Sequence, residues 1–249
     1  MLKYPEGVLF MKDSIDDIKA ILALRPKIAV LTGAGISAES GVPTFRGSDG
    51  YWKGKSAEDL ASMQGFSQDP HGVWEWYNLR RQKLKDIKPN PGHDALVRLE
   101  ELASSFTLVT QNVDRLHQQA GSGQVLELHG SIWPVRCMDC DYQEDRFQVD
   151  LPAEPRCPDC KGWLRPGVVW FGEALPFGIM EKADHAVRMA DLFFIIGTSA
   201  VVWPAAGLAW TAREAGAKVV EINLEETPAT EVAHISLLGK SGEILPQLL

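Results

Sequence analysis

Residues 28–38 read Ile28-Ala29-Val30-Leu31-Thr32-Gly33-Ala34-Gly35-Ile36-Ser37-Ala38. The apolar run is typical of a buried strand, and the segment after it fits the pattern G-x-G-x-x-G/A. In this pattern the glycines permit a tight turn and let the backbone come close to a pyrophosphate. The N–H groups at the N-terminus of the following helix then bind the pyrophosphate. A plain strand-to-helix turn is the alternative. The pattern indicates four candidate dinucleotide contacts: Gly33, Ala34, Gly35 and Ser37.

Short apolar strands alternate with helical segments along most of the chain. Strands are predicted at residues 106–110, 124–128, 192–196 and 218–222, and helices at 14–24, with Ser14 as N-cap, 93–102, 184–190 and 203–215. This alternation predicts an α/β fold with a Rossmann-like parallel sheet and helices on both faces.

Two stretches interrupt the alternation, and we expect them to form a small domain. Residues 46–92 are rich in Gly, Trp and Pro before a predicted helix at 73–86, and residues 134–168 hold the cysteines. The first is the predicted helical module and the second a zinc-ribbon module. The large domain then comprises residues 1–45, 93–133 and 169–249.

One departure from the usual dinucleotide fold is informative. That fold places an acidic residue at the end of a second strand, about 20 positions after the glycines, where it binds the ribose. Here the corresponding residues 47–52 read as a loop. This argues against a hydride-transfer dehydrogenase and makes Asn223, at the end of a late strand, a better candidate ribose contact.

The four cysteines form two C-x-x-C pairs with sixteen residues between them. This spacing predicts one tetrahedral zinc site. A site with four protein ligands has no open position and cannot activate water, so we expect the zinc to be structural. The predicted ligands are Cys137, Cys140, Cys157 and Cys160.

Composition restricts the partners and the compartment. The chain has 249 residues and a formal net charge of −8. An acidic protein is not expected to bind nucleic acid generally; the charge suits a lysine-bearing partner, or merely keeps the protein in solution. The N-terminus does not resemble a signal peptide, and metal-type cysteine spacing favours a reducing, cytoplasmic compartment. The uncharged residues 192–212 are interrupted by glycine and proline, so we expect a buried strand and a helix there, and no membrane partner.

Residues 33–46, which end in Pro43-Thr44-Phe45-Arg46, closely resemble the signature loop of the sirtuins, NAD-dependent protein lysine deacylases. Further matching motifs follow in the family's order: Thr110-Gln111-Asn112-Val113-Asp114, Glu127-Leu128-His129-Gly130, the cysteine pairs, Val169-Trp170-Phe171-Gly172-Glu173, Gly197-Thr198-Ser199 and Glu221-Ile222-Asn223. The resemblance covers nearly the whole chain and implies a cleft for NAD and an acyl-lysine peptide between the two domains. We do not expect the protein to require oligomer formation for this function.

The resemblance also implies the reaction. The acyl oxygen attacks the ribose carbon that bears nicotinamide, nicotinamide leaves, and water resolves the intermediate into free lysine and an O-acyl-ADP-ribose. His129 is the candidate general base, since a histidine can take a proton from a ribose hydroxyl near neutral pH. From the residues alone, a buried structural histidine is the alternative.

The resemblance distributes further cofactor contacts over several loops. Gln111, Asn112 and Asp114 follow a strand, and the last two resemble residues that line the nicotinamide and ribose pocket; turn chemistry is the alternative. The other candidates are Thr44, Phe45, Arg46 and Trp52, with Phe45 and Arg46 in a loop over the cofactor, and Gly197, Thr198, Ser199, Asn223, Leu224 and Ser241 around the adenosine half.

Two segments are candidates for binding the substrate. Residues 168–172 (Val168, Val169, Trp170, Phe171 and Gly172) resemble the family's segment that pairs with the peptide as an added strand; a core strand is the alternative. Tyr77 and Arg80 lie on one face of a predicted helix and, with Ala61, resemble the sirtuin class that removes malonyl, succinyl and glutaryl groups, whose members can also deacetylate. An amphipathic helix with a solvated arginine is the alternative.

Two other classes of function compete with deacylation. A mono-ADP-ribosyltransferase would break the same glycosidic bond of NAD and transfer ADP-ribose to protein. A non-catalytic zinc-ribbon binding module is disfavoured by the acidic charge and by the complete set of candidate catalytic residues.

Overall fold

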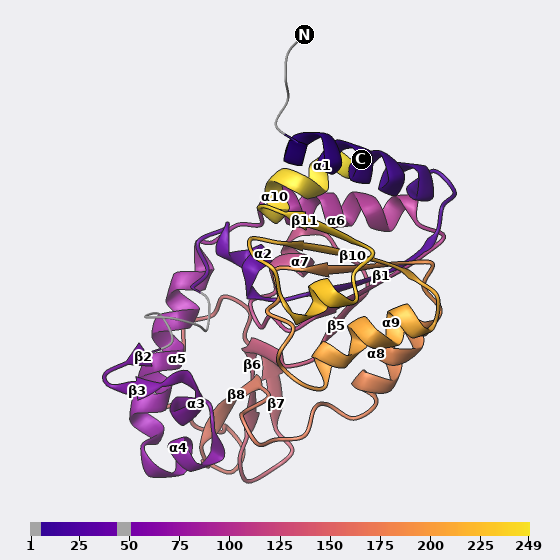
Figure 1. Ribbon diagram of the computed structural model, residues 1–249. Helices are drawn as coiled ribbons and strands as arrows, with labels where there is room; N and C mark the ends of the chain where they lie inside the picture. Colours follow the sequence, from indigo (N-terminus) through magenta and orange to yellow (C-terminus); the bar gives the residue numbers. More distant parts are fainter. Residues whose placement is uncertain (1–5, 44–50) are drawn as a thin grey trace.

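The computed structural model describes residues 6–43 and 51–249, and the side chains of residues 14–43 and 53–249. Its body is a six-stranded sheet in the order β11-β10-β9-β1-β4-β5, and every neighbouring pair is parallel (Figure 1). The predicted parallel sheet is confirmed. The strands are β1 (Lys27–Thr32), β4 (Ser105–Thr110), β5 (Val125–Glu127), β9 (Leu192–Ile196), β10 (Lys218–Asn223) and β11 (Ile235–Leu238).

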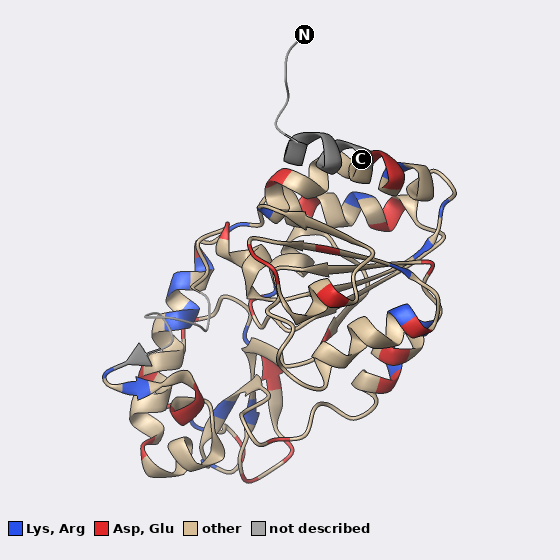
Figure 2. Cartoon of the chain, in the orientation of Figure 1, with Lys and Arg blue, Asp and Glu red and all other residues tan. Residues whose placement is uncertain are grey.

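Helices cover both faces of this sheet, as predicted (Figure 1). Side chains of successive strand residues point to opposite faces; Val30 therefore packs in one core and Leu31 in the other. The charged residues lie mostly on the helices and loops around the sheet (Figure 2). The first core is covered by α1 (Glu6–Leu22), α6 (Pro91–Leu102) and α10 (Ser241–Ile244), and the second by α8 (Ile179–Arg188) and α9 (Leu208–Glu214).

Two helices differ from the sequence-based prediction. Because α1 begins at Glu6, Ser14 lies inside it and is not its N-cap. The buried side chains of Ile15, Ile18 and Leu22 hold this helix on the sheet, and such packing outweighs the preference of serine for a cap. The segment 203–215 divides into a 3₁₀ turn (Ala205–Gly207) and α9. Among the described residues, no helix is long and apolar enough to cross a membrane.

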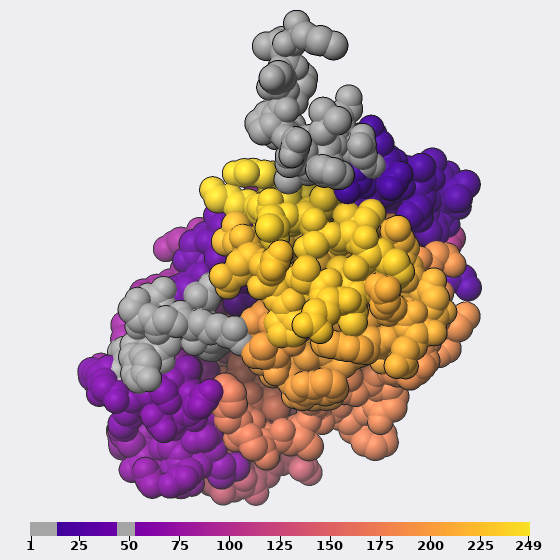
Figure 3. Space-filling model, viewed as in Figure 1, coloured from indigo at the N-terminus to yellow at the C-terminus, as the bar shows by residue number. Residues whose placement is uncertain are grey.

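A third hydrophobic core joins the two segments that interrupt the alternation. It contains Trp74 from the first segment together with Trp133 and Trp170 from around the second. This lobe lies at one end of the molecule, away from α1 (Figure 3). The exact division of the chain into domains stays a prediction. The lobe contains α3 (Ala57–Leu60), α4 (Met63–Gln68), α5 (Pro70–Lys85), the small hairpin of β2 (Tyr51–Trp52) and β3 (Lys55–Ser56), and the antiparallel strands β7 (Gln143–Asp145), β6 (Gly130–Cys137) and β8 (Leu164–Val168).

Arg81 of α5 is buried in this lobe and has a structural task. Its guanidinium donates hydrogen bonds to four backbone carbonyls, those of Ile132, Trp133, Arg146 and Val149. A buried cation is tolerated only when its donors are paired, and these four acceptors pair them. Arg81 therefore ties α5 to β6 and to the loop after β7.

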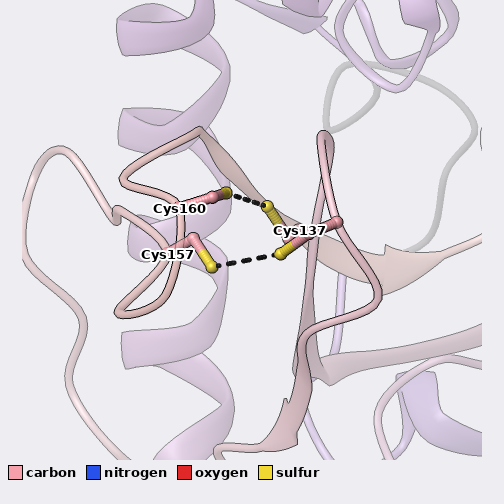
Figure 4. Close-up of side chains that lie close together, drawn as sticks. Cys137, Cys157 and Cys160 are labelled. Atoms are coloured by element: carbon pink, nitrogen blue, oxygen red, sulfur yellow. Dashed lines mark hydrogen bonds between the residues drawn. The ribbon is translucent and has the colours of Figure 1, made fainter.

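The cysteines form the expected cluster, and Figure 4 shows the thiols of Cys137, Cys157 and Cys160 pointing toward one another. The first cysteine of each pair donates its N–H to a carbonyl five residues on, Cys137 to Tyr142 and Cys157 to Gly162, at 2.8 Å in both cases. Two similar turns thus present the thiols to one point. The Sγ atoms of all four cysteines lie within 4.8 Å of one another.

The geometry of the cluster fits zinc. A tetrahedral site with Zn–S bonds of about 2.3 Å separates its sulfurs by about 3.8 Å. The Sγ–Sγ distances are 3.4 Å for Cys137 and Cys160 and 3.6 Å for Cys140 and Cys157, too long for disulfides. These four cysteines would hold one Zn²⁺ and fill all of its coordination positions. The zinc is therefore structural.

Removal of this zinc should unfold the small lobe before the sheet. We expect one zinc per chain in metal analysis, and expect Cys160→Ser or strong chelation to release it and to lower the Tm. Each 1 kcal/mol lost lowers Tm by about 2–4 °C in a protein of this size. A metal-depleted protein that melts like the untreated one would contradict the structural assignment.

Candidate active site

The candidate residues meet at the carboxyl-terminal edge of the central sheet. The loops after β1, β4, β5, β9 and β10 all open at this edge, because these strands are parallel. From β1 the sheet runs to β4 and β5 on one side and to β9, β10 and β11 on the other. Ligands of open α/β sheets bind where the strand order reverses in this way.

The glycine-rich loop makes an unusually close contact with the loop after β9. A Cβ on Gly33 would lie 2.7 Å from the Cβ of Thr198, and a Cβ on Gly35 would lie 2.6 Å from the Cα of Gly197. Gly197 itself has a φ of +58°, which favours glycine. The three glycines therefore allow two loops to touch through their backbones.

The same contact includes two backbone hydrogen bonds between the loops. The N–H of Gly33 donates to the carbonyl of Ile196 and that of Gly35 to the carbonyl of Gly197. β9 and its loop therefore already accept the hydrogen bonds of these two N–H groups, and the role of Gly33 and Gly35 as cofactor contacts stays a prediction. The helix that follows, α2 (Ala34–Ala38), has only five residues.

Side-chain amides join the loops to one another. Asn112 donates to the carbonyl of Gly33 at 3.0 Å and to Oγ of Ser37 at 3.1 Å. Gln111 donates to Oγ1 of Thr198 at 2.9 Å, and Asn223 donates to the backbone oxygen of Thr198 at 2.8 Å. The predicted residues of four loops thus form one hydrogen-bonded edge.

Asp114 is a buried carboxyl group at this edge. Burial raises its pKa, while hydrogen bonds from the Leu116 N–H and the Ser37 hydroxyl and the charge of Arg80 act in the opposite direction. Oδ1 accepts the Leu116 N–H at 2.9 Å. An ionisable group buried among such partners is typical of a functional site.

His129 follows β5 and presents one ring nitrogen as a base. Its Nδ1 lies 3.2 Å from the carbonyl oxygen of Gln111. Since a carbonyl can only accept, Nδ1 carries the proton and Nε2 keeps its lone pair. Burial lowers the pKa of His129, although the Gln111 carbonyl partly offsets this, so the neutral base is favoured.

A cavity of about 410 Å³ lies beside the glycine-rich loop, at the end of β10. The carboxylate of Glu39, at its edge, accepts hydrogen bonds from the Ser241 hydroxyl at 2.6 Å and from the Gly242 N–H at 3.1 Å. Its predicted lining residues are Gly35, Gly197, Asn223, Leu224 and Ser241, and those that the sequence analysis missed include Ala38, Glu39, Gly239 and Lys240. Glu39 lies in the signature loop, so its position was a usable signal.

The substrate segment is partly buried and partly exposed. Val168 and Trp170 are buried, whereas Phe171 is 55% exposed. The N–H of Val169 donates to the carbonyl of His129 at 2.9 Å, and that of Phe171 to the carbonyl of Ala61 at 2.8 Å. The segment thus runs from the candidate base to the candidate acyl residues.

Of the three candidate acyl residues, Tyr77 contacts Trp170 directly. The indole N–H of Trp170 donates to the hydroxyl oxygen of Tyr77 at 3.0 Å, and Ala61 belongs to the same buried cluster. Arg80, one turn after Tyr77, lies over the Trp76 ring at 5.1 Å from its centroid. Burial lowers the pKa of Arg80, and the charges of Tyr77 and Asp114 act in the opposite direction.

A buried ion pair that the sequence analysis missed supports this segment. Arg165 of β8 contacts both carboxylate oxygens of Glu173, at 2.5 and 2.9 Å, and its Cζ lies 3.3 Å from the centroid of the Trp170 ring. Glu173 also accepts the N–H of Trp170 at 2.8 Å. Glu173 stood within a recognised motif, but no local pattern marked Arg165.

The side chains of four predicted cofactor contacts lie outside the described part of the structure. Thr44, Phe45 and Arg46 lie outside the described residues, and for Trp52 only the backbone, in β2, is described. Ser199 follows Thr198 in the loop after β9 and is half-buried.

Comparison with known proteins agrees with this geometry. Residues 33–204 match the model of the Sir2 family. An NAD-dependent protein deacylase of Aquifex aeolicus is 50% identical over 216 residues, which cover 86% of this chain and 90% of the relative. One of Pyrococcus furiosus is 47% identical over 241 residues, 94% of this chain and 96% of the relative.

Solved structures give the same result. A crystal structure of a Sir2 homologue in complex with NAD superposes with a TM-score of 0.87 at 44% identity, over 95% of this chain and 91% of the other. A Sir2 complex with a p53 peptide and NAD⁺ superposes with a TM-score of 0.82 at 33% identity, over 96% of each chain. The resemblance seen in the sequence is confirmed: the chain is an enzyme of the Sir2 family.

Proposed function

We propose that this protein is an NAD-dependent protein lysine deacylase that removes succinyl and malonyl groups as well as acetyl groups. Its partners are acyl-lysine proteins. The observation that carries the acidic-acyl preference is the buried pairing of Tyr77 with Trp170 one helical turn from Arg80. Cysteines spaced for metal support a cytoplasmic site of action.

The cofactor end of the site suits a dinucleotide. The cavity of about 410 Å³ at Asn223 and Ser241 would hold the adenosine half of NAD, which as co-substrate supplies the reactive ribose carbon. Asn112 and Asp114 would line the nicotinamide and ribose pocket. Because both amide hydrogens of Asn112 are donated to Gly33 and Ser37, its Oδ1 is the atom that can accept from a ligand.

His129 would act as the general base. The carbonyl of Gln111 holds the Nδ1–H, so Nε2 can take a proton from a ribose hydroxyl and make that oxygen nucleophilic toward the acyl carbon. The peptide would add as a strand beside residues 168–172. Since the N–H groups of Val169 and Phe171 are already donated inside the protein, such a strand would have to use other backbone groups of this segment.

The pH dependence tests the base. Burial lowers the pKa of His129 below its ordinary value of 6.5, so the neutral form persists into mildly acidic solution. We expect the acidic limb of kcat/KM for deacylation to be centred below pH 6.5. His129→Asn should abolish deacylation and leave the fold intact by circular dichroism. An acidic limb centred above the ordinary value would contradict this geometry.

The acyl pocket can bind a carboxylate by two kinds of contact. The Trp170 indole is only a donor, so Tyr77 uses its oxygen for Trp170 and can turn its own O–H toward a ligand. Arg80 adds a cation in a half-buried setting, where a charge-assisted hydrogen bond to a carboxylate is stronger than in water. The small side chain of Ala61 leaves room for a longer acyl chain.

Arg80→Met should separate the two activities. We expect kcat/KM on a succinyl-lysine peptide to fall by about 100-fold, since a charged hydrogen-bond donor is lost, and kcat/KM on the acetyl peptide to change by less than about threefold. Tyr77→Phe, which keeps the ring, should cost about tenfold on succinyl-lysine alone.

Arg81→Met is the matched control. Its guanidinium serves four carbonyls of the fold, so its loss should lower stability and reduce both activities alike. Equal losses of desuccinylation and deacetylation in Arg80→Met would reject the acidic-acyl preference. Lack of any NAD-dependent lysine release by the wild type would reject deacylation itself.

A further inference from the structure

Two buried histidines lie in contact beneath the active-site edge, and the proposed mechanism uses neither. His93 of α6 and His117 of α7 (Leu116–Ala120) have ring centroids 4.9 Å apart and are 0% and 1% exposed. Burial lowers the pKa of His93 to about 4. Burial, and secondarily the charge of His93, lowers the pKa of His117 well below its ordinary value. Both rings are therefore neutral near pH 7, and each has one N–H and one lone pair.

The protein determines which nitrogen of His93 carries the proton. The backbone N–H of Asn90, the N-cap of α6, donates to Nδ1 of His93 at 3.3 Å. Nδ1 must therefore hold the lone pair, and Nε2 carries the hydrogen. Nε2 is buried and has no hydrogen-bond partner among the described residues.

The tautomer of His117 follows from the direction in which the neighbouring Thr32 hydroxyl donates. Oγ1 of Thr32 donates its only hydrogen to Oγ1 of Thr110 at 2.8 Å. Nε2 of His117, 2.9 Å from Oγ1 of Thr32, must then be the donor in that contact. Nδ1 of His117 consequently holds a lone pair, and within the described part of the chain this buried atom has no partner either.

The two ring nitrogens without a partner among the described residues are complementary as hydrogen-bond donor and acceptor. The Nε2–H of His93 is a donor and Nδ1 of His117 is an acceptor, on rings in contact. At the opposite end of this series of hydrogen bonds, Oγ1 of Thr110 accepts the backbone N–H of Asn112 at 3.1 Å. With one water between the two rings, a single direction of donation would run from Asn90 through both imidazoles and Thr32 to Thr110, the group that holds Asn112.

We propose that His93, His117, Thr32 and Thr110 form an ordered hydrogen-bonded chain that positions Asn112 for nicotinamide, an inference that rests on the proposed placement of Asn112 in the nicotinamide pocket. The two imidazoles pair through Nε2–H and Nδ1 by way of one enclosed water, because neither nitrogen reaches a protein partner directly within the described residues. Side-chain bonds to Gly33 and Ser37 orient the amide of Asn112, and the chain sets the backbone from which it projects. His117 is thus a positioning residue, with no contact to the reacting atoms.

The test compares His117→Leu with His117→Gln. Leucine removes the donor to Thr32, whereas the glutamine amide can place an N–H near the former Nε2 and retain it. We expect His117→Leu to raise the inhibition constant of nicotinamide, a product of the reaction, by about fivefold to tenfold, and His117→Gln to restore most of it. Binding of ADP-ribose, which lacks nicotinamide, should stay within about twofold in calorimetry. His185→Gln, on the exposed side of α8, is the control for histidine replacement and should match the wild type.

Other outcomes would overturn the proposal. An unchanged inhibition constant of nicotinamide in His117→Leu would overturn it. Equal weakening of nicotinamide and ADP-ribose binding, not restored in His117→Gln, would also overturn it, because that result indicates only a structural role. If His117→Leu does not fold, the comparison of Thr110→Val with Thr110→Ser tests the same proposal at the residue that accepts the Asn112 N–H. Only Thr110→Val should weaken nicotinamide binding.

A second measurement separates this proposal from the proposed function. Nitrogen-15 spectra of the wild-type imidazoles at pH 7 should show both His93 and His117 neutral and protonated at Nε2. Protonation of either ring at Nδ1 would overturn the chain, whatever the enzyme does. A wild type with these tautomers that releases no nicotinamide from NAD and an acyl-lysine peptide would instead reject the proposed function.

Discussion

The pairing of β6 with β8 is the constraint on which the active site depends. At one end Cys137 lies opposite Leu164, next to the zinc-binding turns, and at the other Gly130 lies opposite Val168. Gly130 has a φ of +68°, and a Cβ there would lie 2.2 Å from the carbonyl oxygen of Gly167, so only glycine allows this register. His129 precedes that glycine. A metal roughly 20 Å from the chemistry, estimated from the length of β6, thus helps to hold the candidate base in place.

The body supplies the complementary constraint through backbone contact. Where Gly33 and Gly35 meet Gly197, the loops after β1 and β9 share hydrogen bonds that a side chain would break. Asn112, Gln111 and Asn223 then join the loops after β4 and β10 to this contact. The described loops of this edge are therefore tied together by contacts within the protein, which lowers the free energy that a ligand must spend on ordering them.

Local patterns predicted the elements well and the contacts between them poorly. The apolar run 192–196 coincides with β9, since a strand buried on both faces needs only its own residues to be recognised. β11 was missed because it is a short edge strand whose residues are alternately buried and exposed. The contact of Gly35 with Gly197 and the ion pair of Arg165 with Glu173 depend on how distant or unmarked residues meet in space, which periodicity does not encode.

In the proposed function, recognition of the acyl group and recognition of the peptide would be physically coupled. The hydroxyl of Tyr77 is held by the indole of Trp170, the N–H of Trp170 is held by Glu173, and Glu173 is held by the buried Arg165 of β8. Trp170 also lies within the segment beside which the peptide would add. A peptide that shifts this segment must therefore shift the partner of Tyr77. Selectivity between acyl groups should accordingly depend on the sequence around the acyl-lysine, because the same indole would contact both the acyl pocket and the peptide segment.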